Sequence, residues 1–195
     1  MVKRIFDFFV SIIGLVILFP LFILISISIF FLDPGDIFFL QIRVGRYGKL
    51  FTLYKFRTMT KNNNFKSHVT VSGDIRITKI GQILRKYKLD ELPSLLNVFL
   101  GKMSLVGPRP DVPGYADKLL GNNTKILKLR PGITSPASIK YANEESLLLN
   151  KIDPQEYNDN IIFPDKIKLN LEYYENQSLW LDIKIIFATI FRTSY

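Results

Sequence analysis

Residues 76–110 read RITKIGQILRKYKLDELPSLLNVFLGKMSLVGPRP and predict two helices, a short break between them, and a loop rich in glycine, proline and arginine. Apolar side chains at positions 92, 95, 96 and 99 have the i, i+3, i+4, i+7 spacing of one helix face. Pro93 is tolerated in the first turn of that helix, and Gly101 suits the left-handed conformation after its last turn. This second helix is therefore expected to begin at the acid pair Asp90 and Glu91, where unpaired N–H groups and the helix dipole stabilise both as anions.

Positive side chains surround this acid pair in the sequence. Arg85 and two lysines precede it, and Arg109 follows the helix between two prolines that stiffen the backbone. Such cations can bind a phosphate, while Asp90 and Glu91 can hold a divalent metal, or one of them can attack phosphorus. The same residue types also occur in helix caps and surface salt-bridge clusters, so the pattern leaves a purely structural role open.

The helix before the break is predicted from apolar residues at positions 80, 83, 84 and 87. Thr78 precedes this series and is expected to be the N-cap. Arg85 lies in the last turn, where a cation complements the negative end of the helix dipole. From the residues alone, interaction with the helix dipole is enough to explain why an arginine occurs at position 85.

Residues 37–59 predict a β-hairpin. The runs IFFLQIRV and LFTLYKFRTM are rich in aromatic and β-branched residues, and two glycines lie between them. Lys55 and Arg57 lie two positions apart and so share one face of the second strand. That face is either a solvated surface or part of a site. Residues 62–67, which follow, predict a polar loop.

The first 36 residues predict a membrane segment. Positions 8–32 carry no charge, and a helix of that length is about 37 Å long, enough to cross a bilayer core of roughly 30 Å. The run is too long for a secretory signal peptide and lacks a small-residue cleavage pattern.

Pro20 lies in the middle of this segment and removes a helical hydrogen bond. A break there would leave two halves that are too short to span, although proline also occurs in spanning helices. Basic residues flank both ends, which favours both ends on the cytoplasmic side, but Asp33 and Asp36 weaken this signal. The residues alone leave a spanning and a re-entrant helix equally open.

The composition of the chain limits the kinds of partner that are expected. A net charge of +9 over 195 residues favours an anionic partner such as a phosphorylated substrate or an acidic lipid surface. This charge is spread along the chain without a nucleic-acid-binding motif, so nucleic acid is not expected as a partner. The absence of cysteine excludes disulfides and thiolate metal sites. The single histidine, His68, lies in a polar stretch and is expected in a solvated loop.

The C-terminal part predicts helices. Residues 143–165 are polar and acidic, with a turn at Asp153 and Pro154, and no chemistry is expected of them. Residues 165–195 predict one or two helices, of which the last has a broad apolar face that begins near Trp180. That face suits core packing or, alternatively, the headgroup layer of a membrane.

The motifs, taken together, resemble a known family. LRKYKLDELPSLLNVFLGKMSLVGPRP is similar to the signature of bacterial sugar transferases, the monotopic phosphoglycosyl transferases, in the small form that consists of the catalytic domain alone. KRIFD, QIRVG, LYKFRTM, DIRIT and RPGIT follow the same pattern, so the resemblance covers nearly the whole chain. The chain departs from it at Phe19, where the family often has serine, and after Thr134, where Ser135 and Pro136 replace a frequent Gly-Trp.

The resemblance implies a fold of the α+β class, mostly helical with a small β-hairpin. It implies a re-entrant membrane helix-break-helix over residues 1–36, bent at Pro20, and a cytoplasmic catalytic domain with interfacial helices over residues 37–195. The location it implies is the inner membrane of a bacterium, with the catalytic domain on the cytoplasmic face.

The resemblance also implies a reaction, the first membrane step of glycoconjugate assembly. A UDP-sugar would donate a sugar 1-phosphate to a polyprenol phosphate such as undecaprenyl phosphate, and UMP would leave. Asp90 would be the nucleophile that forms a covalent phosphosugar intermediate. Glu91 would help to hold Mg²⁺, together with Asp90, or assist proton transfer. The phosphates would be bound by Arg85, Arg109, Arg130 and Lys55.

Two other functions stay open. A membrane-bound glycosyltransferase that passes only the sugar would release UDP instead of UMP. A non-enzymatic, membrane-anchored interaction protein would use Asp90 and Glu91 as helix caps alone. The sequence assigns neither the sugar, the polyprenol nor the glycan pathway, and it leaves the oligomeric state open, a homodimer included.

Overall fold

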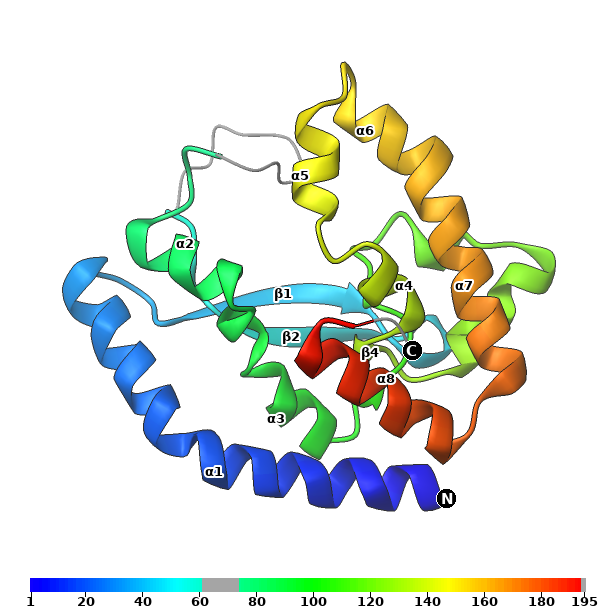
Figure 1. Ribbon diagram of the computed structural model, residues 1–195, viewed down its shortest axis with the longest axis horizontal. Helices are drawn as coiled ribbons and strands as arrows, with labels where there is room; N and C mark the ends of the chain where they lie inside the picture. The colour runs from blue at the N-terminus through cyan, green and yellow to red at the C-terminus, as the bar shows by residue number, and fades with distance from the viewer. Residues whose placement is uncertain (61–73, 194–195) are drawn as a thin grey trace.

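The computed structural model describes residues 1–60 and 74–193, so the predicted polar loop at 62–67 and His68 lie outside the described residues. Helices surround two short sheets, and a long N-terminal helix runs along one side of the molecule (Figure 1). This arrangement confirms the α+β class, mostly helical with a small hairpin. In chain order the elements are α1 (Val2–Leu32), β1 (Phe38–Val44), η1 (Arg46–Gly48), β2 (Leu50–Phe56), α2 (Lys79–Lys86), η2 (Leu89–Glu91), α3 (Ser94–Phe99), β3 (Ser104–Val106), η3 (Ala116–Lys118), η4 (Gly121–Lys128), β4 (Gly132–Thr134), α4 (Pro136–Lys140), α5 (Glu144–Leu149), α6 (Pro154–Tyr157), η5 (Asn158–Ile162), α7 (Phe163–Asn176) and α8 (Leu179–Phe191).

The predicted hairpin is present as β1 and β2, which pair antiparallel from Phe38 opposite Phe56 to Val44 opposite Leu50. A second sheet, for which the local pattern gave no signal, pairs β3 with β4 in parallel. A β-carbon on Gly132 would lie 2.1 Å from the backbone nitrogen of Gly107, so only glycine allows these two segments to approach. The parallel pair therefore brings the Gly-Pro-Arg-Pro loop next to the RPGIT segment.

The first of the two central helices follows the prediction. The Thr78 hydroxyl accepts a hydrogen bond from the backbone N–H of Gly81 at 3.0 Å and caps α2. The helix after the break ends as predicted, since Gly101 adopts a positive φ of 76° just beyond α3.

The start of that second helix was predicted wrongly. The α-helix begins at Ser94, with Pro93 at the cap position, and the acid pair lies in the preceding 3₁₀ turn η2. Lys88, in the left-handed conformation with a φ of 57°, starts the turn, and the N–H of Leu92 bonds the carbonyl three residues back. Because i→i−3 bonds continue through the proline, Asp90 does not serve as the N-cap.

A buried asparagine fixes α3 to the hairpin. The side-chain amide of Asn97, which is 1% exposed, accepts from the N–H of Tyr54 at 3.0 Å and donates to the carbonyl of Thr52 at 2.7 Å. Both partners belong to β2, so α3 and β2 hold a defined register. The main core lies around this junction and contains Phe51, Leu53, Leu95, Val98, Met103, Leu105, Val106, Leu129, Tyr173 and Ile185.

The N-terminal segment forms one continuous helix, α1, that contains Pro20 and bends near its middle instead of being interrupted (Figure 1). It packs against α3, β3 and α2. It is long and apolar enough to cross a bilayer, and little of its most apolar stretch is buried. Its exposed apolar side chains include Ile5, Phe9, Ile13, Val16, Ile17, Phe19, Ile23, Leu24, Ile27, Phe30 and Phe31.

Both ends of α1 are bound to the rest of the molecule. Near the N-terminus, Lys3 donates to the buried carboxylate of Asp182 in α8 at 2.5 Å. One turn later, Asp7 accepts hydrogen bonds at the start of β3. Past the C-terminal end, Arg57 from the end of β2 donates to the backbone carbonyl of Asp33 and lies 3.3 Å from its carboxylate. The two ends are thus attached to one and the same folded body.

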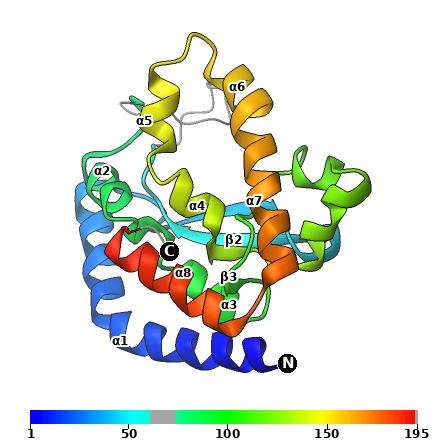
Figure 2. The same ribbon diagram turned by 45° about the vertical axis from the view of Figure 1, so that its right-hand side comes forward.

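The C-terminal region forms two helices, α7 and α8, that pack beside the core (Figure 2). On α8, Ile186 of the predicted apolar face packs against the core, while the buried Ile185 and Ala188 lie outside that predicted face. A second part stays exposed, and it includes Trp180, Phe187, Ile190 and Phe191.

Candidate active site

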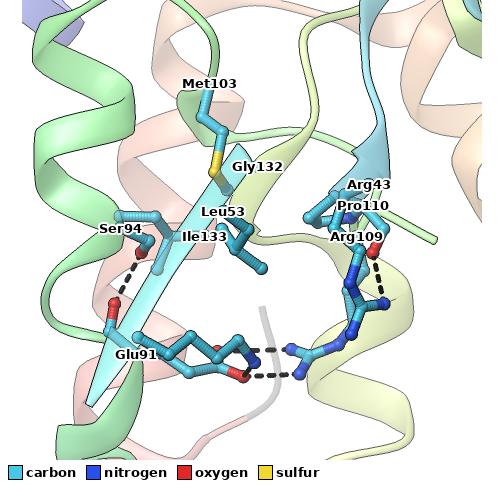
Figure 3. A pocket seen from close by; sticks show the side chains of 10 residues that line it. Arg43, Leu53, Glu91, Ser94, Met103, Arg109, Pro110, Gly132 and Ile133 are labelled. Atoms are coloured by element: carbon cyan, nitrogen blue, oxygen red, sulfur yellow. Dashed lines mark hydrogen bonds and ion pairs between the residues drawn. The ribbon is translucent and has the colours of Figure 1, made fainter. Parts of the chain in front are cut away.

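Glu91 and Arg109 face each other across a cleft (Figure 3). Arg109 Nη2 donates to Glu91 Oε1 at 2.5 Å, and Nη1 donates to Oε2 at 3.3 Å. Lys55 Nζ, which reaches in from β2, donates to the same Oε1 at 2.8 Å. Three predicted site residues from distant parts of the chain therefore meet here. The cleft is lined by Arg43, Leu53, Lys55, Glu91, Ser94, Met103, Arg109, Pro110, Gly132 and Ile133.

These contacts fix the charge of Glu91. Burial alone would raise the pKa of Glu91, but Arg109 and Lys55 outweigh it and hold that pKa well below its ordinary value. Burial lowers the pKa of Lys55, and the charge of Glu91 works against this. The charge of Glu91 is also the main reason why the pKa of Arg109 is raised. Glu91 is therefore a permanent anion at neutral pH, held by two cations.

Asp90 has a different environment, although it is the next residue in the chain. It is 7% exposed, and its enclosed Oδ1 finds no hydrogen-bond partner within residues 1–60 and 74–193. Burial and the charge of Glu91 raise its pKa, while Lys55, Arg85 and Arg109 counteract the rise. A buried carboxylate oxygen without a partner is costly. Asp90, unlike Glu91, thus keeps an oxygen available for a ligand or for bond formation.

Arg85 reaches the site from the last turn of α2. Its charge acts on Asp90, and its Nη2 donates to the carboxylate of Glu145 in α5. Its buried Nε has no partner in the described part of the chain. Residues 143–165, of which no chemistry was expected, thus supply the partner of a predicted phosphate-binding residue. The pairing is invisible in the sequence because the two residues lie 60 positions apart.

Arg130 lies elsewhere. Its Nε donates to the carbonyl of Gly101 at 3.0 Å, so its side chain lies at the C-terminal end of α3, whereas the acid pair precedes the N-terminal end. Burial and the nearby charges of Arg46 and Arg4 lower its pKa. The structure does not bring Arg130 to the other predicted phosphate-binding residues, and here it complements the end of a helix.

Two residues near the cleft were not predicted. Arg43 of β1 donates from Nη1 to the carbonyl of Pro110 at 3.0 Å, and burial and the charge of Arg109 lower its pKa to about 10 (Figure 3). Asp111 follows Pro110, and burial raises its pKa to about 6. The register of the hairpin could have identified Arg43. Lys55 pairs with Phe39, and Arg43 lies four positions further along β1, so Arg43 and Lys55 share one face of the sheet.

Within the acid pair, Asp90 suits a magnesium ion shared with a substrate better than Glu91 does. The described residues contain no cluster of three or more histidine or acidic side chains that could hold a metal alone. Mg²⁺ is, however, commonly held by one or two carboxylates together with substrate phosphates and water. Asp90 Oδ1, which lacks a partner, suits this role best, while both oxygens of Glu91 already accept from Arg109 or Lys55.

Comparisons with known proteins show the family of the chain. The family model described as bacterial sugar transferase matches residues 1–194. The UDP-glucose:undecaprenyl-phosphate glucose-1-phosphate transferase of Klebsiella pneumoniae is 36% identical over 194 residues, which are 97% of this chain and 39% of that protein. The uncharacterized sugar transferase EpsL of Bacillus subtilis (strain 168) is 37% identical over 189 residues, 96% of this chain and 85% of that protein.

A third relative acts on another sugar. The UDP-N-acetylgalactosamine-undecaprenyl-phosphate N-acetylgalactosaminephosphotransferase of Aeromonas hydrophila is 33% identical over 193 residues, 97% of this chain and 43% of that protein. The chain thus spans about two fifths of the Klebsiella and Aeromonas proteins and most of the Bacillus protein. With the family model matched over nearly the whole length and cations gathered around the acid pair, the chain belongs to the bacterial sugar transferase family.

Proposed function

We propose that this protein transfers a sugar 1-phosphate from a UDP-sugar to a polyprenol phosphate, with undecaprenyl phosphate as the acceptor, and releases UMP through a covalent intermediate on Asp90. The names of two relatives specify a UDP-sugar and undecaprenyl phosphate. The observation that carries the mechanism is the environment of Asp90, a buried carboxylate with a partnerless oxygen among three cations.

In the first step, an oxygen of Asp90 attacks the phosphorus that bears the sugar. The bond from this phosphorus to the bridging oxygen breaks, and UMP leaves with that oxygen. The sugar phosphate is then bound to Asp90 as an acyl phosphate, a mixed anhydride. An ionised carboxylate needs no general base for this attack, so the neighbouring Glu91 is free to act as a fixed charge.

In the second step, a phosphate oxygen of the polyprenol phosphate attacks the same phosphorus. The bond to Asp90 breaks, the carboxylate is regenerated, and the sugar is left on a polyprenol diphosphate. Both steps bring an anion towards an anion. Lys55, Arg85 and Arg109 lie near enough to Asp90 to act on its charge, and they reduce this repulsion.

Mg²⁺ is part of the proposal. Asp90 and Glu91 would hold it together with diphosphate oxygens of the donor, and it would neutralise charge there. Arg130 has no part in this site, since it lies at the opposite end of α3.

We also propose that α1 is re-entrant and lies in the inner membrane, with the catalytic domain on the cytoplasmic face. A helix that spans a bilayer has its ends on opposite faces. Lys3 and Asp33, near the two ends of α1, are both bound to the same folded body, which supports an entry and an exit on one side. The acceptor phosphate lies at this membrane surface, because transfer of the polyprenol chain into water costs about 0.8 kcal/mol per CH₂.

Intact-protein mass spectrometry with a panel of UDP-sugars tests the reaction. We expect the wild type to gain the mass of one sugar phosphate with its preferred donor, with UMP as the nucleotide product. Asp90→Asn keeps the shape of the side chain, and we expect it to gain no mass and to lose turnover by at least about 10³-fold. Full turnover in Asp90→Asn would remove the mechanism, and UDP as the product would indicate a glycosyltransferase instead.

A further inference from the structure

Two adjacent glutamates at the start of α5 bind two different helices. Glu145 pairs with Arg85 of α2, and both carboxylate oxygens of Glu144 accept from Lys166 of α7 at 2.7 Å. Figures 1 and 2 agree with these contacts, since α5 lies between α2 and α7 in both views. α5 therefore bridges α2, the helix that carries Arg85, and α7.

Glu145 is the one side chain that bonds the Arg85 guanidinium in the described part of the chain. It contacts Nη2, which leaves Nε and Nη1 of Arg85 to another acceptor. A guanidinium has five N–H donors in a rigid fork, and two of them suit adjacent phosphate oxygens. The contact thus fixes Arg85 through Nη2 and leaves its other N–H groups to donate to a phosphate.

Stability is a poor explanation of this pair. The side chains of Arg85 and Glu145 are 21% and 40% exposed, and ion pairs in such positions contribute only about 0–1 kcal/mol. A long arginine side chain that lacks a partner has many rotamers, and binding of a phosphate would have to order it. A carboxylate that orders the arginine side chain before the phosphate binds lowers the entropy cost of binding.

We propose that Glu145 is a positioning residue, which holds Arg85 in the orientation that binds the diphosphate of the donor. This inference rests on the proposed function, because it takes the nucleotide sugar as the ligand of Arg85. The role is assigned to Glu145 and not to its neighbour Glu144, which bonds Lys166.

The test compares Glu145→Gln with Glu144→Gln, since both variants remove one negative charge from the same turn of α5. We expect Glu145→Gln to raise the KM for the UDP-sugar about tenfold and to change kcat by less than about threefold, because donor binding is lost and the chemistry is not. The same variant should raise the Kd for UDP, measured by titration calorimetry, about tenfold. Glu144→Gln should change both quantities by less than about twofold, and Glu145→Asp should lie between the wild type and Glu145→Gln.

A double-mutant cycle separates positioning from a general effect of charge. In an Arg85→Gln background, Glu145→Gln should change the Kd for UDP by less than about twofold, because there is no guanidinium left to orient. A tenfold rise in the Kd for UDP on adding Glu145→Gln to the Arg85→Gln variant would overturn the proposal. Equal effects of Glu145→Gln and Glu144→Gln would also overturn it, as would tighter binding in Glu145→Gln, which would mean that the carboxylate competes with the donor.

The two proposals fail separately. If the wild type transfers no sugar phosphate, the proposed function fails, while the Kd values for UDP still decide the role of Glu145. If the wild type is active and Glu145→Gln matches it in KM and Kd, the role of Glu145 alone is refuted.

Discussion

At the scale of single residues, the main feature is that neighbouring carboxylates have opposite environments. Glu91 accepts from Arg109 and Lys55, and its pKa is held low. Asp90 is buried, one of its oxygens has no partner among the described residues, and its pKa is raised. Adjacent positions therefore hold a fixed anion, Glu91, and a carboxylate with an oxygen that has no partner among the described residues, Asp90. This difference supports the assignment of the nucleophile to Asp90 and of an electrostatic role to Glu91.

A third carboxylate, Asp111, offers a pH test of the local burial. Its folded pKa of about 6 is raised from 3.8, so the protonated form stabilises the fold below about pH 4, and this contribution is lost as the pH rises through about 6. We therefore expect Asp111→Asn to match the wild type at about pH 3.5 and to be more stable at pH 8, by about 1–2 kcal/mol. Thermal unfolding of the detergent-solubilised protein at both pH values measures this, and a wild type that is the more stable form at pH 8 would contradict it.

The sequence predicted which cations lie near the acid pair for three of the four residues that it proposed. Lys55, Arg85 and Arg109 reach the acid pair, and family-specific motifs carry all three. Arg130 was expected with them but lies at the other end of α3, since the position of a side chain depends on packing that its motif does not encode. Glu145 and Arg43 were missed because contacts across long sequence distances leave no periodic signal.

At the scale of elements, local patterns predicted the hairpin, α2 with its Thr78 cap, and the end of α3 at Gly101. These features depend on neighbouring residues, so propensity and capping rules apply to them. The parallel pairing of β3 with β4 depends on two segments that are far apart in the chain, and it gave no local signal. The late start of α3 depends on a run of i→i−3 bonds, which the apolar spacing cannot distinguish from a longer α-helix.

The contact between α3 and β2 is the element-scale feature on which the site depends most. It sets Lys55 of β2 against Glu91, and Asn97 holds it with hydrogen bonds to two backbone groups of β2. Asn97→Leu would leave both backbone groups buried and unpaired, so we expect a loss of about 2–4 kcal/mol of unfolding free energy. Chemical denaturation measures the loss.

The control for this variant is Asn160→Leu, at an exposed position of η5, which should change the unfolding free energy by less than about 0.5 kcal/mol. If Asn97→Leu were as stable as this control, the hydrogen bonds of Asn97 would not be what holds α3 and β2 together.

At the scale of the whole molecule, the attachment of α1 decides how the protein meets the membrane. Lys3 and Asp33 tie its two ends to one body, and its exposed surface is apolar along most of its length. Helix α8 lies beside the N-terminal part of α1 in Figure 1 and Figure 2, and it also carries exposed apolar residues, Trp180 among them. The sequence alone left the topology undecided, because the attachment of both ends appears only in the folded chain.

Cysteine labelling tests this topology directly, since the chain contains no cysteine. We introduce Val2→Cys and Leu40→Cys, at two exposed positions, the first residue of α1 and a residue of β1 beyond the C-terminal end of α1. A membrane-impermeant maleimide should label neither variant in intact cells and both variants in inverted membrane vesicles. A variant that is labelled from outside in intact cells would mean that α1 spans the bilayer.

The continuous bend of α1 has a consequence for its lipid surroundings. In the proposed re-entrant arrangement, the bent α1 would displace acyl chains from one leaflet only, so its hydrophobic match would be set by the depth of that leaflet and not by the full thickness of the bilayer. The protein would then be exempt from the thickness-based sorting that acts on spanning helices, and it would introduce an asymmetry of lateral packing between the two leaflets.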